Sequence, residues 1–439
     1  MISEALTPER ARGLDGPVWL AEKRFSAAQQ LQACALPTTD LEEWRYSPIE
    51  DWSSAEWRLP DSTPEESVVE RARELLGSLG PLDASLILID GAMVHCSLSE
   101  QATAAGVTLK LAGEDLAALE RHPGTVAATE SFDLLNEAYC RAPIYLRVPR
   151  NVCLADPIAL ISLVTGSGQP AEASLVTSRL VADVGENAEV ALIDWLGSAG
   201  DARSLVVPRN DIAVARSARV RLVQVNNLNS HSDQVGSLLV DVGQEASFSL
   251  HYASLGGNYS RGRFEVRLSG RGASGDLNAL YYGQGHQTHD LRTFQTHDAP
   301  DTTSNLVFKG ALDDHSHSVY TGLIRVAENA RGTNATQANR NIKLSDSAWA
   351  ESVPNLEILN NDVRCAHASA VGPIDEDQRF YLESRGVPPE VAERLVVAGF
   401  FEEVLAGISH GPTCSLIRSL LHEAVSARST AQPELKVRS

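Results

Sequence analysis

A faint internal repeat constrains the fold of this chain more than any other sequence feature. An alanine that follows a polar, turn-forming phrase recurs at intervals of 30, 28 and 27 residues and then after 57, which is about twice the others. The alanines are Ala188, Ala218, Ala246, Ala273 and Ala330. A turn followed by a strand, repeated with such a period, is typical of a β-solenoid whose coils each hold two or more strands. The alternative fold is a β-sandwich in which similar turns recur by chance.

The sequence between about residue 143 and residue 365 supports a β-rich core around this repeat. Short runs of alternating apolar and polar residues, such as 144–148 and 220–225, lie between turns rich in glycine, asparagine, aspartate and serine. Helical periodicity is almost absent from this part of the chain. We therefore expect a mainly β fold with a solenoid at its centre.

Helical patterns precede the β-rich part. Residues 19–34 carry apolar side chains at helical spacing. Another helix is predicted to begin with Thr63 as its cap, Pro64 in its first turn and Glu66 closing a capping box. This helix is expected to run to about residue 76.

Helices are also expected after the β-rich part. The phrase at 375–378 resembles a capping box with an aspartate as the cap, and its helix is expected to end near Gly386. Two more helices are predicted over 388–405 and 413–425. Because a solenoid has open ends that must be covered, these helical segments either cover the ends or act as docking sites for partner subunits.

These patterns predict three parts of the chain. The first is an N-terminal helical region, residues 1–84, and the last is a C-terminal helical domain, residues 371–439. Between them, residues 85–370 form the strand entry and the solenoid core. The core is expected to carry a helical insertion near residues 112–142, centred on 134–139.

Charge and composition limit the function class of the 439-residue chain. Asp and Glu outnumber Lys and Arg by 57 to 37, which argues against nucleic-acid binding because that needs a basic face. The polar N-terminus predicts no secretory signal, and no apolar run approaches the ~20 residues of a membrane-spanning helix. The six cysteines form no CxxC pair. We expect a cytoplasmic protein that binds neither nucleic acid nor a membrane.

Five of the twelve histidines lie between residues 286 and 317. On a strand, His315 and His317 would project from the same face, as metal ligands do. The alternative is a polar solenoid face on which histidines pair with Asp290, Asp298 or Asp301. Spacing alone leaves both interpretations open.

Cys365 and His367 form a second candidate site. On an extended segment two residues apart, they face the same side. A thiol beside an imidazolium has a lowered pKa, so it ionises and binds soft metals more readily. Two ligands do not complete an iron site, so the others must come from elsewhere or from another chain. The alternative is a buried cysteine and a hydrogen-bonded histidine in the last coil.

Signatures of a free-standing enzyme are weak. No phosphate-binding loop of the G-x-x-x-x-G-K-[ST] type is present, so we expect no ATP hydrolysis by this chain. The G-x-S-x-G match at 407–411 lacks a preceding strand. The pair Asp313 and Asp314 suggests a β-helix hydrolase or lyase, or simply a solvated turn. That enzyme and a purely structural β-helix module are the alternatives from other functional classes.

Several long phrases resemble the SufB/SufD family of iron–sulfur cluster assembly scaffold proteins. In chain order they are HDLRTFQTH at 289–297, KGAL at 309–312, ATQANRNIKLS at 335–345, PNLEI at 354–358, DVRCAH at 362–367 and FYLESRG at 380–386. The phrase LPTT at 36–39, followed by EEWRYSP at 42–48, is similar to the SufD branch. The additional N-terminal cysteines that SufB-like chains usually carry are missing, which argues against a SufB-like primary scaffold.

The resemblance implies a right-handed parallel β-helix between helical segments. It also implies a non-ATPase scaffold that pairs with a SufB-like chain through its β-helix and supports cluster assembly and iron acquisition. By analogy His367, with Cys365 beside it, is a ligand for iron or a nascent iron–sulfur cluster at the SufB interface. The cargo is then bound transiently and not held permanently by the isolated chain, which is expected to be able to form a homodimer.

The resemblance further implies that a SufC-like ATPase binds the C-terminal helices, over residues 380–405. The residues expected at this contact are Phe380, Tyr381, Arg385, Gly386 and Phe400. One departure from the family pattern lies beside the candidate ligand. The family usually has His-Gly-Ala where this chain has His367-Ala-Ser, and losing the glycine restricts the backbone next to the imidazole.

Overall fold

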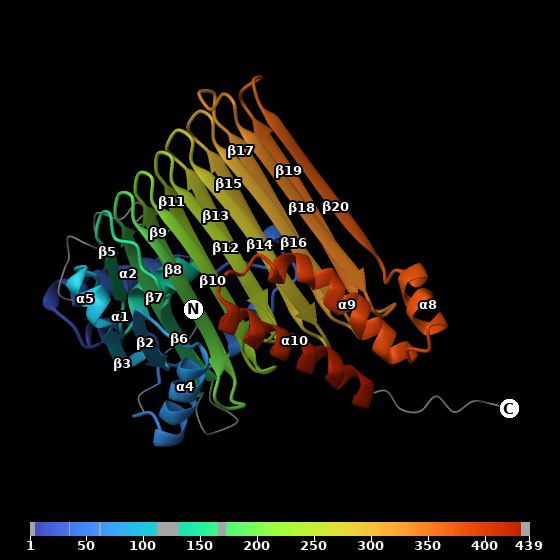
Figure 1. Ribbon diagram of the computed structural model, residues 1–439. Helices are drawn as coiled ribbons and strands as arrows, with labels where there is room; N and C mark the ends of the chain where they lie inside the picture. Colours follow the sequence, from blue (N-terminus) through green and yellow to red (C-terminus); the bar gives the residue numbers. More distant parts are fainter. Residues whose placement is uncertain (1–4, 35, 61–62, 112–130, 166–172, 432–439) are drawn as a thin grey trace.

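The computed structural model describes residues 5–34, 36–60, 63–111, 131–165 and 173–431. Within them two ten-stranded sheets run along a solenoid, and helices lie against the solenoid and near its two ends (Figure 1). The predicted mainly β solenoid is confirmed, and the β-sandwich alternative is wrong because successive coils stack in parallel. The right-handed winding stays a prediction from the family resemblance.

The two sheets are named by their strands. The β5–β19 sheet contains, in spatial order, β19 (Trp349–Ile358), β17 (His317–Val326), β15 (Thr288–His297), β13 (Tyr259–Leu268), β11 (Ser232–Val242), β9 (Ser204–Val214), β7 (Ala173–Val184), β5 (Ile144–Val148) and β4 (Thr108–Leu111), with β1 (Trp57–Arg58) beside β7. The β6–β20 sheet contains β20 (Arg364–Pro373), β18 (Asn334–Lys343), β16 (Thr303–Leu312), β14 (Ser274–Gly283), β12 (Ser247–Ser254), β10 (Arg219–Asn227), β8 (Glu189–Ser198), β6 (Ile158–Val164), β2 (Ala84–Ile89) and β3 (Ala92–Leu98).

Each coil contributes one strand to each sheet, and its length is the period of the sequence repeat. For example, β10 pairs in parallel with β8 and β12, so that Arg219 lies between Glu189 and Ser247. Among the described strands, antiparallel pairing is confined to β2 with β3 and β4 with β5, where the chain enters the solenoid.

The repeated small residues lie where each coil turns into the β6–β20 sheet. Four of the five alanines directly precede β8, β10, β12 and β14, where they are buried and follow a residue with positive φ. Ala330 is out of phase with them, because Thr302 and Thr333 directly precede β16 and β18. The hydroxyls of these threonines hydrogen-bond to each other at 3.1 Å. Threonine therefore replaces alanine at this position in the later coils, and the interval of 57 residues to Ala330 does not follow the coil period.

Apolar side chains fill the space between the sheets in columns that run from coil to coil. Burial of each such leucine stabilises the fold by about 1.5–3 kcal/mol. One buried column on the β6–β20 sheet consists of Leu192, Leu222, Leu250, Leu277 and Leu306. The interior becomes polar in the last coils, where Asn339 and Asn341 hydrogen-bond to each other and to the hydroxyl of Tyr281.

Three helices cover the outer face of the β6–β20 sheet: α4 (Glu66–Ser78), α9 (Pro389–Leu405) and α10 (Gly411–Ala431). Figure 1 shows α9 and α10 lying across the strands of this sheet. Lys309 on β16 fixes α9 in place, because its ammonium group donates to the Phe400 carbonyl at 2.8 Å and pairs with Glu403. The exposed helix α8 (Glu376–Ser384) follows β20 directly.

The outer face of the β5–β19 sheet is covered by N-terminal elements and one insertion helix. A buried cluster joins this face to α1 (Pro8–Arg12), α2 (Val18–Ala33), α3 (Ile49–Ser54) and α7 (Ser131–Tyr139). The short helices η1 (Glu42–Trp44) and α5 (Glu100–Ala104) complete the N-terminal part. We call residues 42–46, which contain η1, the N-terminal strap.

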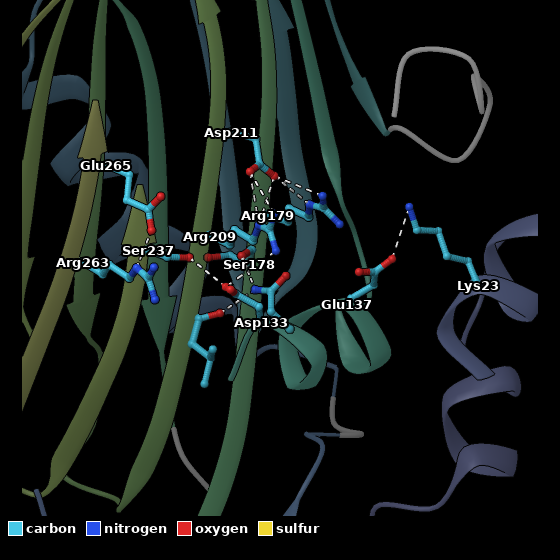
Figure 2. A network of polar contacts seen from close by, with 12 residues as sticks. Lys23, Asp133, Glu137, Ser178, Arg179, Arg209, Asp211, Ser237, Arg263 and Glu265 are labelled. Carbon is cyan, nitrogen blue, oxygen red and sulfur yellow. Dashed lines mark hydrogen bonds and ion pairs between the residues drawn. The ribbon is translucent and has the colours of Figure 1, made fainter. Parts of the chain in front are cut away.

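A buried charge network fixes α7 to the sheet beneath it (Figure 2). Asp211 on β9 is fully buried and accepts hydrogen bonds from the guanidinium groups of Arg179 and Arg209, at 3.1–3.2 Å. Arg209 also pairs with Asp133 of α7 at 3.6 Å, and Ser237 donates to the same carboxylate at 3.3 Å. Burial raises the pKa of Asp133, and the charge of Arg209 opposes that rise.

The N-terminal strap reaches along the β5–β19 sheet as far as the last coil. Its Glu43 carbonyl accepts hydrogen bonds from Arg261 on β13 at 2.7 Å and from Arg292 on β15 at 2.9 Å. The hydroxyl of Tyr46 donates to Glu351 on β19 at 2.8 Å. The EEWRYSP phrase thus contributes its backbone and aromatic rings to contacts between distant coils.

The helix boundaries correct some of the sequence predictions. The predicted cap at Thr63 is wrong, because Glu65 is extended, its carbonyl accepts the first helical hydrogen bonds, and α4 begins at Glu66. Asp375 does cap α8, accepting from two backbone N–H groups. The predicted helix around 134–139 is confirmed in α7, whereas residues 112–130 of that predicted insertion lie outside the described residues. The division into three domains stays a prediction.

Candidate functional site

One end of the solenoid is a coil, made of β19 and β20, with a neighbour on one side only. Within the described chain, β19 pairs with β17 and β20 pairs with β18. Ile324 and Val326 on β17 are fully buried, whereas their register partners Leu356 and Ile358 are 38% and 39% exposed. Because unpaired strand edges and exposed apolar side chains favour association, we call this coil the open end and treat it as a candidate interface.

Cys365 and His367 lie on β20 at this open end. Their register partners on β18 are Ala335 and Gln337, which are both buried inside the solenoid. As alternate residues of one strand, the two side chains therefore point to the same, inward side of the sheet. Cys365 is half-buried against an apolar cluster that includes Ile324, whereas His367 is exposed.

A thiol and an imidazole on one strand are an incomplete set of metal ligands. In the described part of the chain, no group of three or more His, Cys, Asp and Glu side chains is placed to hold a metal ion. Burial raises the pKa of the Cys365 thiol, and a backbone hydrogen bond with Ala335 opposes that rise. The expected lowering of this pKa by the neighbouring imidazolium is wrong, because desolvation dominates. Burial therefore disfavours the thiolate, and the positive charge of a bound ion or of a partner would favour it.

The arrangement of His315 and His317 differs from the prediction. β17 begins at His317, so His315 lies in the preceding turn and not on a shared strand face. The ring of His315 stacks on that of His286 with their centroids 5.3 Å apart, and His317 packs edge-on against Trp349 at 5.7 Å. The strand-face argument for a metal site at these two histidines is therefore wrong.

Two other histidines of this region, His289 and His297, are fully buried in the solenoid interior. His289 is 3.0 Å from the Ser254 hydroxyl, and His297 is 2.8 Å from the Thr302 hydroxyl. Burial lowers the pKa of both imidazoles to about 4. Asp290, one of the three aspartates named as alternative histidine partners, instead pairs with arginines of β13 and β15. These histidines stabilise the interior in their neutral form.

The residues expected to contact an ATPase lie around the α8–α9 turn. Phe380 is 71% exposed and Tyr381 is 57% exposed, although both are large aromatic side chains. The guanidinium of Arg385 lies 5.3 Å from the Tyr381 ring, and Gly386, with a φ of 87°, makes the turn into α9. Phe400 differs from them, because its ring packs beside the ammonium group of Lys309.

The weaker enzyme signatures belong to turns. Asp313 is buried, Asp314 has a positive φ, and the Asp314 carboxylate accepts a hydrogen bond from the Gly285 backbone at 2.9 Å. Residues 406–410 connect α9 to α10, so a helix and not a strand precedes Ser409.

Sequence reasoning missed Gln337. It continues the column of five leucines on the β6–β20 sheet, pairing with Leu306 on one side and with His367 on the other. Its side chain is 2% exposed, yet neither its amide nitrogen nor its oxygen hydrogen-bonds to any described residue. The feature that marks Gln337 is the change from leucine to glutamine within one column of register partners. This change can be recognised only when the strand register is known.

Comparisons with known proteins identify relatives of this chain. The family model for the SufBD core domain of SUF system FeS cluster assembly matches residues 165–400. An iron–sulfur cluster assembly SufBD family protein of Mycobacterium tuberculosis is 32% identical over 65% of this chain and 71% of its own length.

Relatives named iron–sulfur cluster assembly protein SufD match over most of the chain. The protein of Escherichia coli is 28% identical over 86% of both chains. The protein of Bacillus subtilis is 24% identical over 89% of this chain and 90% of its own length. The family model spans more than half of the chain and includes all of the repeated coils from β7 to β20. The chain therefore belongs to the SufB/SufD family of iron–sulfur cluster assembly proteins, and within it to the SufD branch.

Proposed function

We propose that this chain is the SufD-type scaffold subunit of a SUF machine that assembles iron–sulfur clusters. It pairs with a SufB-type chain through the open end, binds a SufC-type ATPase through its C-terminal helices, and presents His367 to iron or a nascent cluster. The observation that carries this proposal is the position of His367. It is an exposed imidazole beside a half-buried thiol, on the last described coil of the solenoid, whose strands β19 and β20 each pair on one side only.

The open end supports transient cargo binding between two chains. Cys365 and His367 supply two ligands, and a partner that covers β19 and β20 supplies the others. Because the site is complete only in the assembled pair, separation of the chains releases the cargo. The same apolar edge, with exposed Leu356 and Ile358, would also favour self-association of the isolated chain in the absence of a SufB-type partner.

The α8–α9 turn supports a separate docking site for the ATPase. Phe380, Tyr381 and Leu395 are exposed apolar or aromatic side chains on these two helices. The opposite side of α9 is fixed to the solenoid by Lys309 and by a buried cluster that includes Phe401. A movement imposed on these helices is thereby transmitted to β16, one coil before β18 and two before β20 in the sheet order. None of the helices in the described part of the chain is long and apolar enough to cross a bilayer.

The test is anaerobic reconstitution with SufB-type and SufC-type partners, comparing wild type with His367→Ala. We expect both proteins to form the ternary complex and the variant to lose most of its bound iron and sulfide. The matched control is His231→Ala, which removes another exposed histidine that lies before β11, far from the open end in the coil order.

The outcomes separate the parts of the proposal. If His367→Ala loads iron and sulfide normally in an intact complex, His367 is not a cargo ligand and the chain only docks its partners. Failure of the wild-type chain to bind either partner would contradict the scaffold assignment itself.

A further inference from the structure

We propose that Gln337 is a positioning residue for His367: its side-chain oxygen accepts the N–H of one imidazole nitrogen and leaves the other free to bind cargo. This inference rests on the proposed function of His367 and adds the residue that prepares its imidazole. The buried amide of Gln337 is energetically unfavourable where it lies. A buried amide without hydrogen bonds costs about 1–3 kcal/mol, and leucine occupies the matching position in the five preceding coils.

The register places Gln337 next to His367. In parallel strands, register partners project side by side from chains that lie about 4.8 Å apart. Gln337 and His367 are such partners on β18 and β20, and both point into the solenoid. A glutamine amide therefore reaches a ring nitrogen of the histidine by rotation of side-chain torsions alone.

The surroundings of Gln337 hold its side chain in the interior. Its amide lies against Gly322 on β17, where an added Cβ would collide with the Gln337 amide nitrogen and the Tyr320 hydroxyl. Gly322 thus provides the space that Gln337 occupies. Since no described residue hydrogen-bonds the amide, its oxygen is available to accept from His367 once the side-chain torsions rotate.

A positioned imidazole is a better ligand than a freely rotating one. Histidines that bind metals generally donate their second ring N–H to an acceptor, which selects one tautomer and orients the ring. In this chain a glutamine supplies that acceptor without adding charge. Loss of such an outer partner typically lowers metal affinity about 10–100-fold.

The test uses Gln337→Met, which keeps the size and flexibility of the side chain but removes the acceptor. The first readout is ¹⁵N NMR of the full-length chain, labelled in its histidine rings, at pH 8, with the His367 signal assigned by its loss in His367→Ala. We expect one dominant His367 tautomer in the wild type and a mixture in Gln337→Met. The second readout is ferrous iron binding by the complex with SufB-type and SufC-type partners, which should weaken about 10-fold or more.

Two further variants make the result specific. Gln337→Glu retains an accepting oxygen at the same distance and should restore the dominant tautomer. Gln295→Met removes another buried glutamine with an unpartnered oxygen, whose column leads to Ile324 and Leu356 and not to His367. This control should leave both the tautomer and iron binding unchanged.

The two proposals fail in different ways. A mixed His367 tautomer in the wild type, or one that does not respond to Gln337→Met, overturns the positioning role even if His367→Ala abolishes iron binding. If His367→Ala has no effect on iron binding, the cargo role fails, while the tautomer measurement still reports whether Gln337 orients the ring.

Discussion

At the scale of single residues, the interior of the solenoid carries ionisable groups whose protonation is coupled to folding. His289 and His297 have pKa values of about 4 in the folded chain, because burial disfavours the imidazolium. An exposed histidine has a pKa of about 6.5. Between these two values the unfolded chain binds protons that the folded chain does not.

The free energy of unfolding should therefore fall as pH is lowered from about 6.5 to about 4, and stay level with respect to these groups below that range. The slope is up to about 1.4 kcal/mol per pH unit for each histidine. Urea unfolding at pH 7, 6 and 5 measures it, and the combined variant His289→Gln and His297→Gln should flatten the dependence. His251, also with a pKa of about 4, accounts for a remaining slope. An unchanged slope in the variant would contradict this assignment.

The buried carboxylate of Asp211 is a second residue with a large expected effect. Asp211→Asn removes the charge that two arginines share, and leaving those charges buried without their partner costs about 3–5 kcal/mol. Chemical denaturation should show this loss. The control Glu22→Gln disrupts an ion pair with Arg12 on the surface, where the cost is about 0–1 kcal/mol. Equal effects of the two substitutions would show that the network in Figure 2 contributes little.

At the scale of elements, the C-terminal helices divide their surfaces between the solenoid and a partner. The double variant Phe380→Ala and Tyr381→Ala removes two rings that are mostly exposed to solvent. We expect a loss of at least about tenfold in affinity for the SufC-type ATPase, since aromatic side chains dominate binding hot spots. Calorimetry measures the effect, and pairing with the SufB-type chain should be unchanged. Weakened pairing with both partners would show that α8 supports the fold of the open end.

Element prediction succeeded where the signal was local and failed where it was not. The cap at Asp375, the turns between the strands and the alternation within the strands each depend on a few adjacent residues, and the sequence predicts them. The cap at Thr63 was mispredicted, because several polar residues before α4 satisfy the same pattern. The strap contact from Tyr46 to Glu351 and the network around Asp211 join distant segments, so no local pattern reports them.

At the candidate site, too, local features were predictable from the sequence and contacts between distant segments were not. The phrase around Cys365 and His367 was recognisable from the sequence, including the side that the two residues share. The effect of burial on the Cys365 thiol was not, because it depends on packing against residues of other coils. Gln337 was overlooked for a related reason, since its meaning comes from its place after Leu306 in a column across coils.

At the scale of the whole molecule, the open end should determine whether the chain is alone or paired. Leu356→Lys combined with Ile358→Lys places two charges where apolar side chains are now exposed, and desolvating them disfavours an interface. We expect loss of both self-association and SufB-type pairing in light-scattering measurements, with SufC-type binding retained. Val18→Lys, a substitution at an apolar residue that is 79% exposed on α2, is the matched control. Pairing that survives the double variant would place the interface elsewhere.

The N-terminal strap has a consequence for how the protein is made. Tyr46 and Glu351 are 305 residues apart in the chain, and at about 5–20 residues per second the ribosome needs about 15–60 s to synthesise that stretch. During this time we expect the coils to stack one after another as they emerge, while Tyr46 of the strap still lacks its partner Glu351. A segment from the beginning of the chain thus completes its contacts only after a segment near the end of the chain has left the ribosome.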